Sequence, residues 1–256
     1  LLIPLQRFLE PCGGGPAQAQ YSLFLVWTQS MKALFYTEFG TPDVLTFGHL
    51  PDPILRPADV LIAVSATALN RLDIVQRNGW FTLPGFSLPH VAGMDLAGTV
   101  VEVGAGVSHV KTGDRVVADP SLHAVGGDSQ FTGLGERYGD LGVIGATHAG
   151  GYGELCAVSA EHVHPIPNAM DFASAAVFPT AWMTTHHALF RVGELRSSET
   201  LLMHGATSAL TLAATQMAVA AGARVLVTAA SEEKCAIAQG LGAAATTTNR
   251  ESDITS

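Results

Sequence analysis

The stretch Leu201–Lys234 reads LLMHGATSALTLAATQMAVAAGARVLVTAASEEK, and it decides the fold. An apolar run at 201–204 leads through a short turn into a segment of helical period. A second apolar run follows at 225–230, and another helix begins directly after it. Strand, helix and parallel strand in this order form the opening unit of a dinucleotide-binding sheet. We therefore expect a parallel α/β sheet in the C-terminal part of the chain.

The turn in this unit lacks the glycines of the G-x-G-x-x-G fingerprint. Ala206, Ser208 and Thr211 occupy those places, and all three are small. The following helix still offers free N–H groups and a favourable dipole to a phosphate. Thr211 is expected to fit worst, because its β-branched side chain lies where helix and strand pack closely. The sequence thus predicts an intact fold with weakened cofactor binding, or a strand–turn–helix that binds nothing.

The segment before residue 166 has a different character. Short apolar runs separated by Gly and Pro predict a barrel-like β domain over residues 31–165. Two runs predict its main strands, Asp59–Ala68 and Asp95–Val103. Residues 166–256 are Ala-rich and predict a partial nucleotide-binding domain, so the expected fold class is α/β plus β.

Composition narrows the possible partners and the compartment. Thirteen Lys and Arg residues against twenty-two Asp and Glu residues give a net charge of −9, which argues against nucleic acid and anionic membrane as partners. The cysteines, Cys12, Cys156 and Cys235, are widely spaced and form no C-x-x-C motif. No apolar run reaches the roughly 20 residues that span a bilayer. We expect a cytoplasmic protein that acts on a small molecule.

Both ends of the chain are unusual. Residues 1–30 show no clear period, and the regular pattern starts at Met31. We expect 1–30 to be an extension that is non-native or disordered, in preference to a signal peptide. A third strand is expected at Ala243–Thr248, close to the last residue, whereas a full doubly wound sheet needs about six strands. A C-terminal truncation with poor stability and weak turnover is therefore expected.

Several motifs in a fixed order resemble the medium-chain dehydrogenase/reductase superfamily, and within it the quinone oxidoreductase-like and alcohol dehydrogenase-like proteins. They are MKALFYTEFGTPDVL (31–45), ALNRLDIVQRNG (68–79), LPHVAGMDLAGTVVEVGAGVSHVKTGDRVV (88–117), GGYGEL (150–155) and the two-strand unit. The resemblance implies a GroES-like domain with the substrate cleft at 31–165 and an incomplete Rossmann domain at 166–256. It also implies a homodimer in the full-length form.

The same resemblance bears on zinc. Zinc-dependent relatives carry a Cys where this chain has Asn70 and a His-Glu pair where it has Met94 and Asp95. Amide and thioether groups are poor zinc ligands. The structural-zinc cysteines of relatives fall, by loop length, on non-ligating residues, namely Ala124, Gly127, Gln130 and Tyr138. We therefore expect no metal site and a zinc-independent protein.

The end of the second strand points to the cofactor. No acid stands at 228–231 to bind the ribose hydroxyls of NAD. Ser231 and Lys234 match the positions that hold the 2′-phosphate in NADPH-using relatives, so NADP(H) is expected. Ser231 is equally a good helix N-cap, and both roles are compatible. The remaining expected cofactor residues are Ser208, Ala209 and Leu210 at the phosphates and, by resemblance, Thr184 near the nicotinamide; Thr184 could instead simply pack a helix.

Without zinc there is no Lewis acid to polarise a simple carbonyl. Hydride transfer from NADPH then favours substrates that delocalise the incoming charge, such as quinones and conjugated enones. Asn70 and Asp73 resemble the N-x-x-D of the cleft and are the catalytic candidates. Asn70 would hydrogen-bond the substrate or the ribose, and Asp73 would be catalytic or helix-stabilising. The alternatives are a non-catalytic relative without cofactor and, more distantly, a zinc-type alcohol dehydrogenase.

Overall fold

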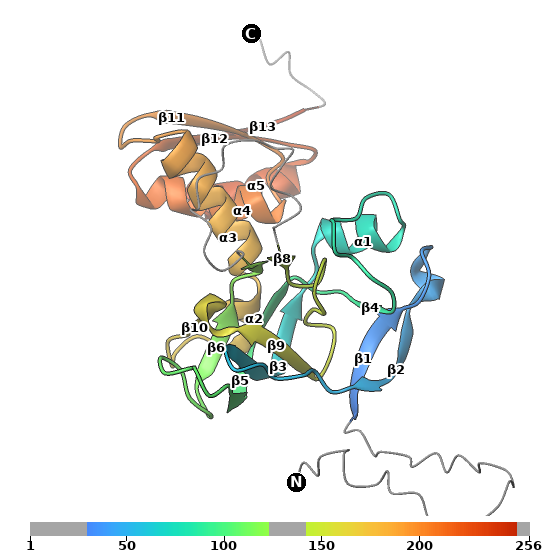
Figure 1. The fold of residues 1–256 in the computed structure, drawn as a ribbon. Helices are drawn as coiled ribbons and strands as arrows, with labels where there is room; N and C mark the ends of the chain where they lie inside the picture. The colour runs from blue at the N-terminus through green and yellow to red at the C-terminus, as the bar shows by residue number, and fades with distance from the viewer. Residues whose placement is uncertain (1–29, 123–141, 250–256) are drawn as a thin grey trace, which may run out of the picture.

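The computed structural model describes residues 30–122 and 142–249, and it contains a β part followed by an α/β part (Figure 1). This order is the expected fold class. The expected extension at 1–30 lies outside the described residues except for Ser30, which begins the first strand. Within the described ranges no helix is long and apolar enough to cross a membrane.

The larger sheet of the β part is antiparallel, with strand order β10-β6-β5-β3-β9. Its strands are β3 (Asp59–Ala68), β5 (Asp95–Val103), β6 (Arg115–Ala118), β9 (Leu155–Ser159) and β10 (Val163–Pro165). β3 and β5 have the bounds that the sequence predicts. Alternate residues of these strands, such as Val60, Ile62, Leu96 and Val100, turn inward and form the barrel core. The central pair thus supports both the core and the loops that follow it.

A second, smaller sheet completes the barrel-like shape. It contains β1 (Ser30–Tyr36), β2 (Thr46–Pro51) and β4 (His90–Val91), in the order β2-β1-β4, and a separate ribbon pairs β7 (Ser121–Leu122) with β8 (Gly142–Val143). The segment 151–154 joins the two sheets, because the Tyr152 carbonyl accepts from Leu34 N at 2.7 Å and the Glu154 carbonyl accepts from Val64 N at 2.9 Å. Short helical turns lie at η2 (Pro42–Val44), α1 (Arg71–Arg77) and η3 (Ala160–His162).

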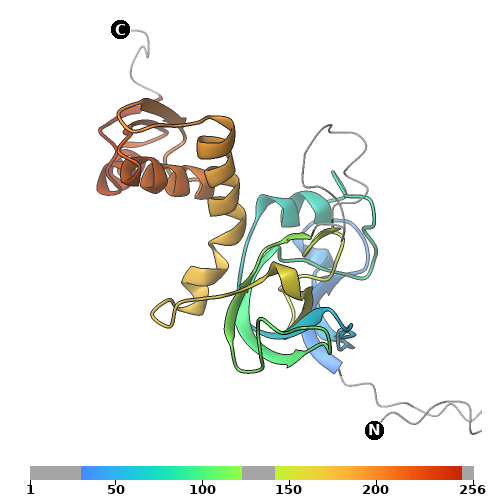
Figure 2. The same ribbon diagram turned by 60° about the vertical axis from the view of Figure 1, so that its left-hand side comes forward.

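Two helices lead from the barrel to the second part of the chain. α2 (Phe172–Ala176) packs on the barrel, where Ala175 and Ala176 contact Ala97 and Ile166. α3 (Pro179–His186) continues as a π-helix, η4 (His187–Val192). α3 begins at Pro179, a residue that is well suited to a first helical turn. α3 lies between the barrel and the C-terminal sheet (Figures 1 and 2).

The C-terminal part is a parallel sheet with strand order β11-β12-β13. Its elements are β11 (Thr200–His204), α4 (Ala209–Ala220), β12 (Arg224–Ala229), α5 (Glu232–Gly240) and β13 (Ala245–Thr248). Val225, Val227 and Ala218 are fully or almost fully buried between sheet and helices. The decisive stretch therefore folds as strand, helix, strand and helix, as its periodicity predicts.

Candidate functional site

The turn between β11 and α4 is made by Gly205. Its φ of 85° is left-handed, and a Cβ added there would meet nothing within 4 Å. The sharp turn therefore occurs one residue before Ala206, the position at which the fingerprint predicts a glycine. Ala206 is buried at 2% exposure beneath the turn. The sequence analysis missed Gly205, although a glycine directly after an apolar strand is the signal that identifies such a turn.

The first turn of α4 is capped by Ser208. Its Oγ accepts a hydrogen bond from Thr211 N at 3.1 Å and lies 2.8 Å from Thr211 Oγ1. Thr211 is 2% exposed, yet its hydroxyl has a partner. The cap therefore supplies the partner that the buried Thr211 hydroxyl needs. The N–H groups of Ala209 and Leu210, at the first two helical positions, have no acceptor within the helix and remain available to a ligand.

Ser231 and Lys234 lie at the start of α5. Ser231 Oγ accepts from Lys234 N at 3.4 Å, which is the N-cap role, while the Lys234 side chain is exposed. The strands before α4 and α5 are paired neighbours, and His204 Nδ1 lies 3.0 Å from Thr228 Oγ1 at their carboxyl ends. Both helix starts therefore occupy the same edge of the parallel sheet, where dinucleotides bind in such folds.

Thr184 lies on α3 and is exposed. The adjacent Thr185 is buried, and its Oγ1 donates to the Leu210 carbonyl at 3.3 Å. α3 thus contacts the first turn of α4 directly. The helix that carries Thr184 is in this way held against the turn that carries Ser208, Ala209 and Leu210.

Asp73 lies in the first turn of α1 and is 8% exposed. One carboxylate oxygen accepts from Asn70 N at 2.7 Å and from the Tyr152 hydroxyl at 2.9 Å, and the other accepts from Gly93 N at 3.2 Å. The first of these contacts is half of a capping box. The other two bonds tie the start of α1 to the neighbouring segments at Gly93 and Tyr152. In this geometry Asp73 acts as a helix-stabilising carboxylate.

Asp95, at the start of β5, is the residue that the sequence analysis did not assign to the site. It is 2% exposed, and one oxygen accepts from Asn70 Nδ2 at 3.0 Å. The other accepts from Thr180 N at 3.0 Å and from Thr180 Oγ1 at 2.7 Å. Burial raises the pKa of Asp95, the hydrogen bonds from Thr180 and Asn70 lower it in part, and the charge of Asp73 raises it further. Asp95 thereby joins α1, β5 and α3.

The positions that carry zinc ligands in relatives are already occupied by other contacts. Asn70 and Asp95 bond to each other, and Met94 packs in an apolar cluster with Leu83 and Val143. Within residues 30–122 and 142–249, no group of three or more His, Cys, Asp or Glu side chains could hold a metal. The expected non-ligands of the structural-zinc loop, 124, 127, 130 and 138, lie outside the described residues.

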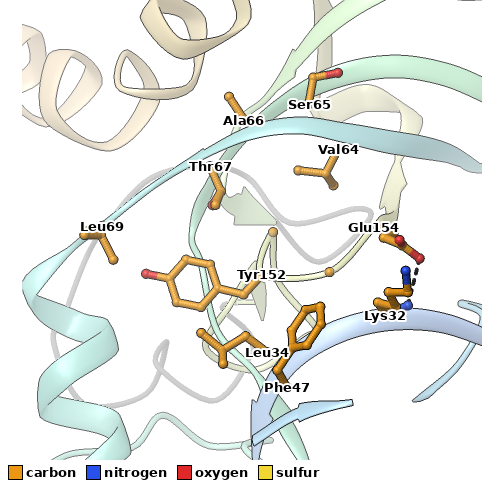
Figure 3. A pocket seen from close by; sticks show the side chains of 12 residues that line it. Lys32, Leu34, Phe47, Val64, Ser65, Ala66, Thr67, Leu69, Tyr152 and Glu154 are labelled. Carbon is orange, nitrogen blue, oxygen red and sulfur yellow. Dashed lines mark hydrogen bonds between the residues drawn. The ribbon is translucent and has the colours of Figure 1, made fainter. Parts of the chain in front are cut away.

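A groove of about 490 Å³ crosses the barrel beside α1 (Figure 3). Its walls are apolar and come from β1, β2 and β3, with Leu34, Phe47 and Val64 prominent among them. Gly151, Tyr152 and Gly153 also line it, and Leu69 borders it on the side of α1. Neither the two catalytic candidates nor the six cofactor candidates line this groove. It is therefore a neighbour of the candidate site and not its centre.

Comparisons with known proteins agree with this architecture. Residues 56–168 match the family described as "Alcohol dehydrogenase GroES-like domain". The chain is 33% identical over 207 residues to a quinone oxidoreductase of Rattus norvegicus, covering 79% of this chain and 54% of the relative. It is 33% identical over 216 residues to a chloroplastic NADPH-dependent alkenal/one oxidoreductase of Arabidopsis thaliana, covering 84% and 51%. The chain spans about half the length of the curated relatives it matches.

Solved structures give the same result. A crystal structure of an NAD-dependent alcohol dehydrogenase superposes with a TM-score of 0.77 at 33% identity, covering 86% of this chain and 64% of that chain. A quinone oxidoreductase of Pseudomonas syringae pv. Tomato DC3000 superposes with a TM-score of 0.72 at 26% identity, covering 88% and 60%. The likeness therefore extends across both parts of the fold.

Proposed function

The chain belongs to the medium-chain dehydrogenase/reductase superfamily and is quinone oxidoreductase-like. We therefore propose that it functions as a zinc-independent oxidoreductase that reduces a quinone or conjugated enone with NADPH. The observation that carries the proposal is the β11–Gly205–α4 unit. It presents a left-handed glycine turn and a helix N-terminus at the carboxyl edge of a parallel sheet.

The residues at this edge suit a phosphorylated dinucleotide. Space is open beside Gly205, so a pyrophosphate can approach the backbone there. Ala209 and Leu210 offer N–H groups to it, while Ser208 holds the helix start in place. Ser231 and Lys234 would bind the 2′-phosphate, for which a lysine supplies a compact positive charge. When bound, NADPH would supply the hydride.

The donor chemistry at the zinc positions supports a mechanism without metal. A zinc ion there would need at least three suitable ligands, whereas Asn70 is an amide and Asp95 already accepts from Asn70 and Thr180. The chain's own contribution would be to hold the reactants and exclude water. Substrates that delocalise the incoming charge by themselves fit this arrangement. The names of the rat and Arabidopsis relatives mention such substrates, namely a quinone and an alkenal or alkenone.

The choice of NADPH over NADH is tested by titrating both cofactors into the chain and following reduced-nicotinamide fluorescence. NADPH is expected to bind more tightly, in the micromolar range. Ser231→Ala and Lys234→Met should bring the two affinities close together by removing the contacts to the 2′-phosphate. Lys32→Met, a change on the barrel groove, is the charge-matched control and should leave the ratio unchanged. Equal wild-type affinities would contradict the NADP(H) assignment.

The alternatives give different results in the same assay. A non-catalytic relative would bind neither cofactor even at millimolar concentration, in keeping with its missing fingerprint glycines. A zinc-type alcohol dehydrogenase would oxidise simple alcohols and lose activity after treatment with a chelator. The proposed enzyme should oxidise NADPH in the presence of a benzoquinone or an α,β-unsaturated ketone, with no loss after chelation.

We also propose the cytoplasm as the compartment. Cys156 and Cys235 are both buried free thiols, which is the usual state in a reducing environment. Fractionation of the source cells with an antibody to this chain would test it, and recovery from an oxidising compartment or an organelle would contradict it.

A further inference from the structure

The apolar groove beside α1 adjoins the candidate site at one of its ends. Leu69 lines that end and directly precedes Asn70 in the chain. Tyr152 lines the groove as well, and its hydroxyl, which points toward α1 in Figure 3, donates to Asp73 at 2.9 Å. Both catalytic candidates therefore have a direct neighbour or a hydrogen-bond partner among the groove residues.

The stretch of the groove away from α1 is apolar. Leu34 and Phe47 form one side of it, and Val64 and Ala66 of β3 form the other (Figure 3). Phe47 keeps 73% of its surface exposed, although it lies in the middle of this stretch. A hydrocarbon ligand over the Phe47 ring would remove apolar area of both partners from water, which favours binding.

Two of the three hydroxyl groups in the groove are already hydrogen-bonded to the protein. The Tyr152 hydroxyl bonds to Asp73, and the Thr67 hydroxyl donates to the Asp95 carbonyl at 2.7 Å. Only the Ser65 hydroxyl has no such bond among the described residues. A sugar or another ligand with many polar groups would therefore find few partners along the groove.

The charged residues of the groove lie at the end away from the candidate site. The Glu154 carboxylate accepts from the Lys32 backbone N at 2.8 Å, and Figure 3 shows both residues on the side opposite Leu69. Among the described residues that line the groove, no other side chain is charged. The groove is thus apolar between the candidate site and a charged outer end, which suits a ligand with one polar end and a hydrocarbon chain.

We propose that this groove binds the hydrocarbon side chain of the substrate, so that the substrate is a quinone or enone that carries an unbranched alkyl chain. The inference rests on the proposed function. The reacting group would lie beside Asn70, and the chain would pass Leu69 and lie between Phe47 and Val64. Residues 64–69 of the groove wall span about 17 Å. An octyl chain, with carbon–carbon bonds of about 1.5 Å, is at most about 11 Å long and fits within it.

Chain length should therefore control affinity. Complete burial of one methylene group strengthens binding about fourfold, and a groove that is open on one side should give about twofold. A ligand with an octyl chain has six more methylenes than one with an ethyl chain, so it should bind roughly 60-fold more tightly.

The experiment uses 4-ethylphenol and 4-octylphenol, which are unreactive analogues of a ring with a short and a long chain. Isothermal titration of each into the full chain measures the ratio of affinities. Phe47→Asp should reduce this ratio below about fivefold, whereas Phe47→Leu should keep most of it, because leucine preserves an apolar wall. Ile54→Asp is the matched control: Ile54 is 84% exposed and lies outside the groove, so the ratio should not change. Thermal melts establish that each variant is folded.

The proposed function is measured separately, by NADPH oxidation with 3-penten-2-one and 3-decen-2-one. If neither enone is reduced, the proposed function fails, and the two phenols still decide the role of the groove. The groove proposal is overturned if the phenols bind equally, or if the ratio persists in Phe47→Asp. A wild-type dimer that binds neither phenol and that Phe47→Asp dissociates would show that the groove holds a second copy of the chain, which also overturns the proposal.

Discussion

The guanidinium group of Arg115 lies 4.5 Å from the centre of the Phe172 ring, a cation–π contact between β6 and the first residue of α2. The same group donates to the carbonyl oxygens of Asn168 at 3.0 Å and Met170 at 2.6 Å. One side chain therefore holds the segment that leaves the barrel, and it satisfies carbonyl groups that have no strand partner.

Replacing Arg115 by Ala should loosen this segment. We expect a loss of roughly 1–3 kcal/mol in the free energy of unfolding, from the hydrogen bonds and the ring contact together. Arg115→Lys should recover only part of it, because an ammonium group lacks the planar fork. Urea unfolding measures both. Arg196→Ala, which removes an exposed pair with Glu194 at 3.6 Å, should have no measurable effect. Equal stability of the Arg115 and Arg196 variants would contradict the assignment.

Asp73→Ala tests the structural role of that carboxylate. The change leaves the N–H groups of Asn70 and Gly93 and the Tyr152 hydroxyl without their acceptor. The expected loss is roughly 3–5 kcal/mol, so much of the chain could unfold at 37 °C. Tyr152→Phe removes one of these bonds and should cost about 1 kcal/mol. Calorimetry on both variants measures the difference. A stable Asp73→Ala chain that fails only in NADPH oxidation would show that Asp73 is catalytic instead.

Ser208→Gly restores one fingerprint glycine and removes the cap of α4. A glycine N-cap costs only a few tenths of a kcal/mol relative to serine, whereas alanine costs about 1 kcal/mol. Loss of the Oγ also releases Thr211 N for a ligand. We expect NADPH to bind Ser208→Gly at least as tightly as the wild type, and Ser208→Ala to be the less stable variant. Isothermal titration and thermal melts provide the two readouts. Weaker binding by the glycine variant would mean that the hydroxyl itself contacts the phosphate.

His90 should make stability depend on pH. It is 4% exposed, its Nε2 lies 2.9 Å from the Gly145 carbonyl, and burial lowers its pKa. Below the ordinary value of about 6.5, the unfolded chain takes up a proton that the folded chain resists. The free energy of unfolding should therefore fall as the pH drops from about 6.5 toward the lowered pKa. Asp95 has the opposite sign, because burial raises its pKa and the free energy of unfolding therefore falls as the pH rises above the ordinary pKa of a carboxyl group.

Urea unfolding at pH 7.5 and 5.5 measures this dependence. His90→Gln should reduce the difference between the two pH values. His148 also has a pKa lowered by burial, so His148→Asn is needed to separate its contribution. If His90→Gln shows the same pH dependence as the wild type, another group is responsible.

The sequence predicts well those elements whose signals are local. β3 and β5 have the expected bounds because each is a run rich in apolar and β-branched residues that lies between turn-forming residues. Likewise, α4 and α5 begin after serines that cap them, close to the positions that the pattern indicates. In each case the decisive interaction lies within a few residues of the element itself.

Features that depend on distant residues escaped the sequence analysis. β2 (Thr46–Pro51) is polar at several positions and exists because β1 pairs with it. The link from Asp95 to Thr180 spans 85 residues, and nothing near either residue indicates it. Hydrogen bonds between distant residues therefore determine these features, and local sequence patterns do not indicate them.

α3 is held at both of its ends by different parts of the molecule. Its first turn is bonded to the barrel through Thr180 and Asp95, and its last turn is bonded to α4 through Thr185. The segment at 167–170 is held as well, by Arg115. Opening and closing of the two parts therefore cannot occur by swinging about the connecting segment while these bonds remain intact. Any rotation of one part relative to the other must bend α3 between residues 180 and 185. The helix therefore resists such a rotation and does not act as a free hinge.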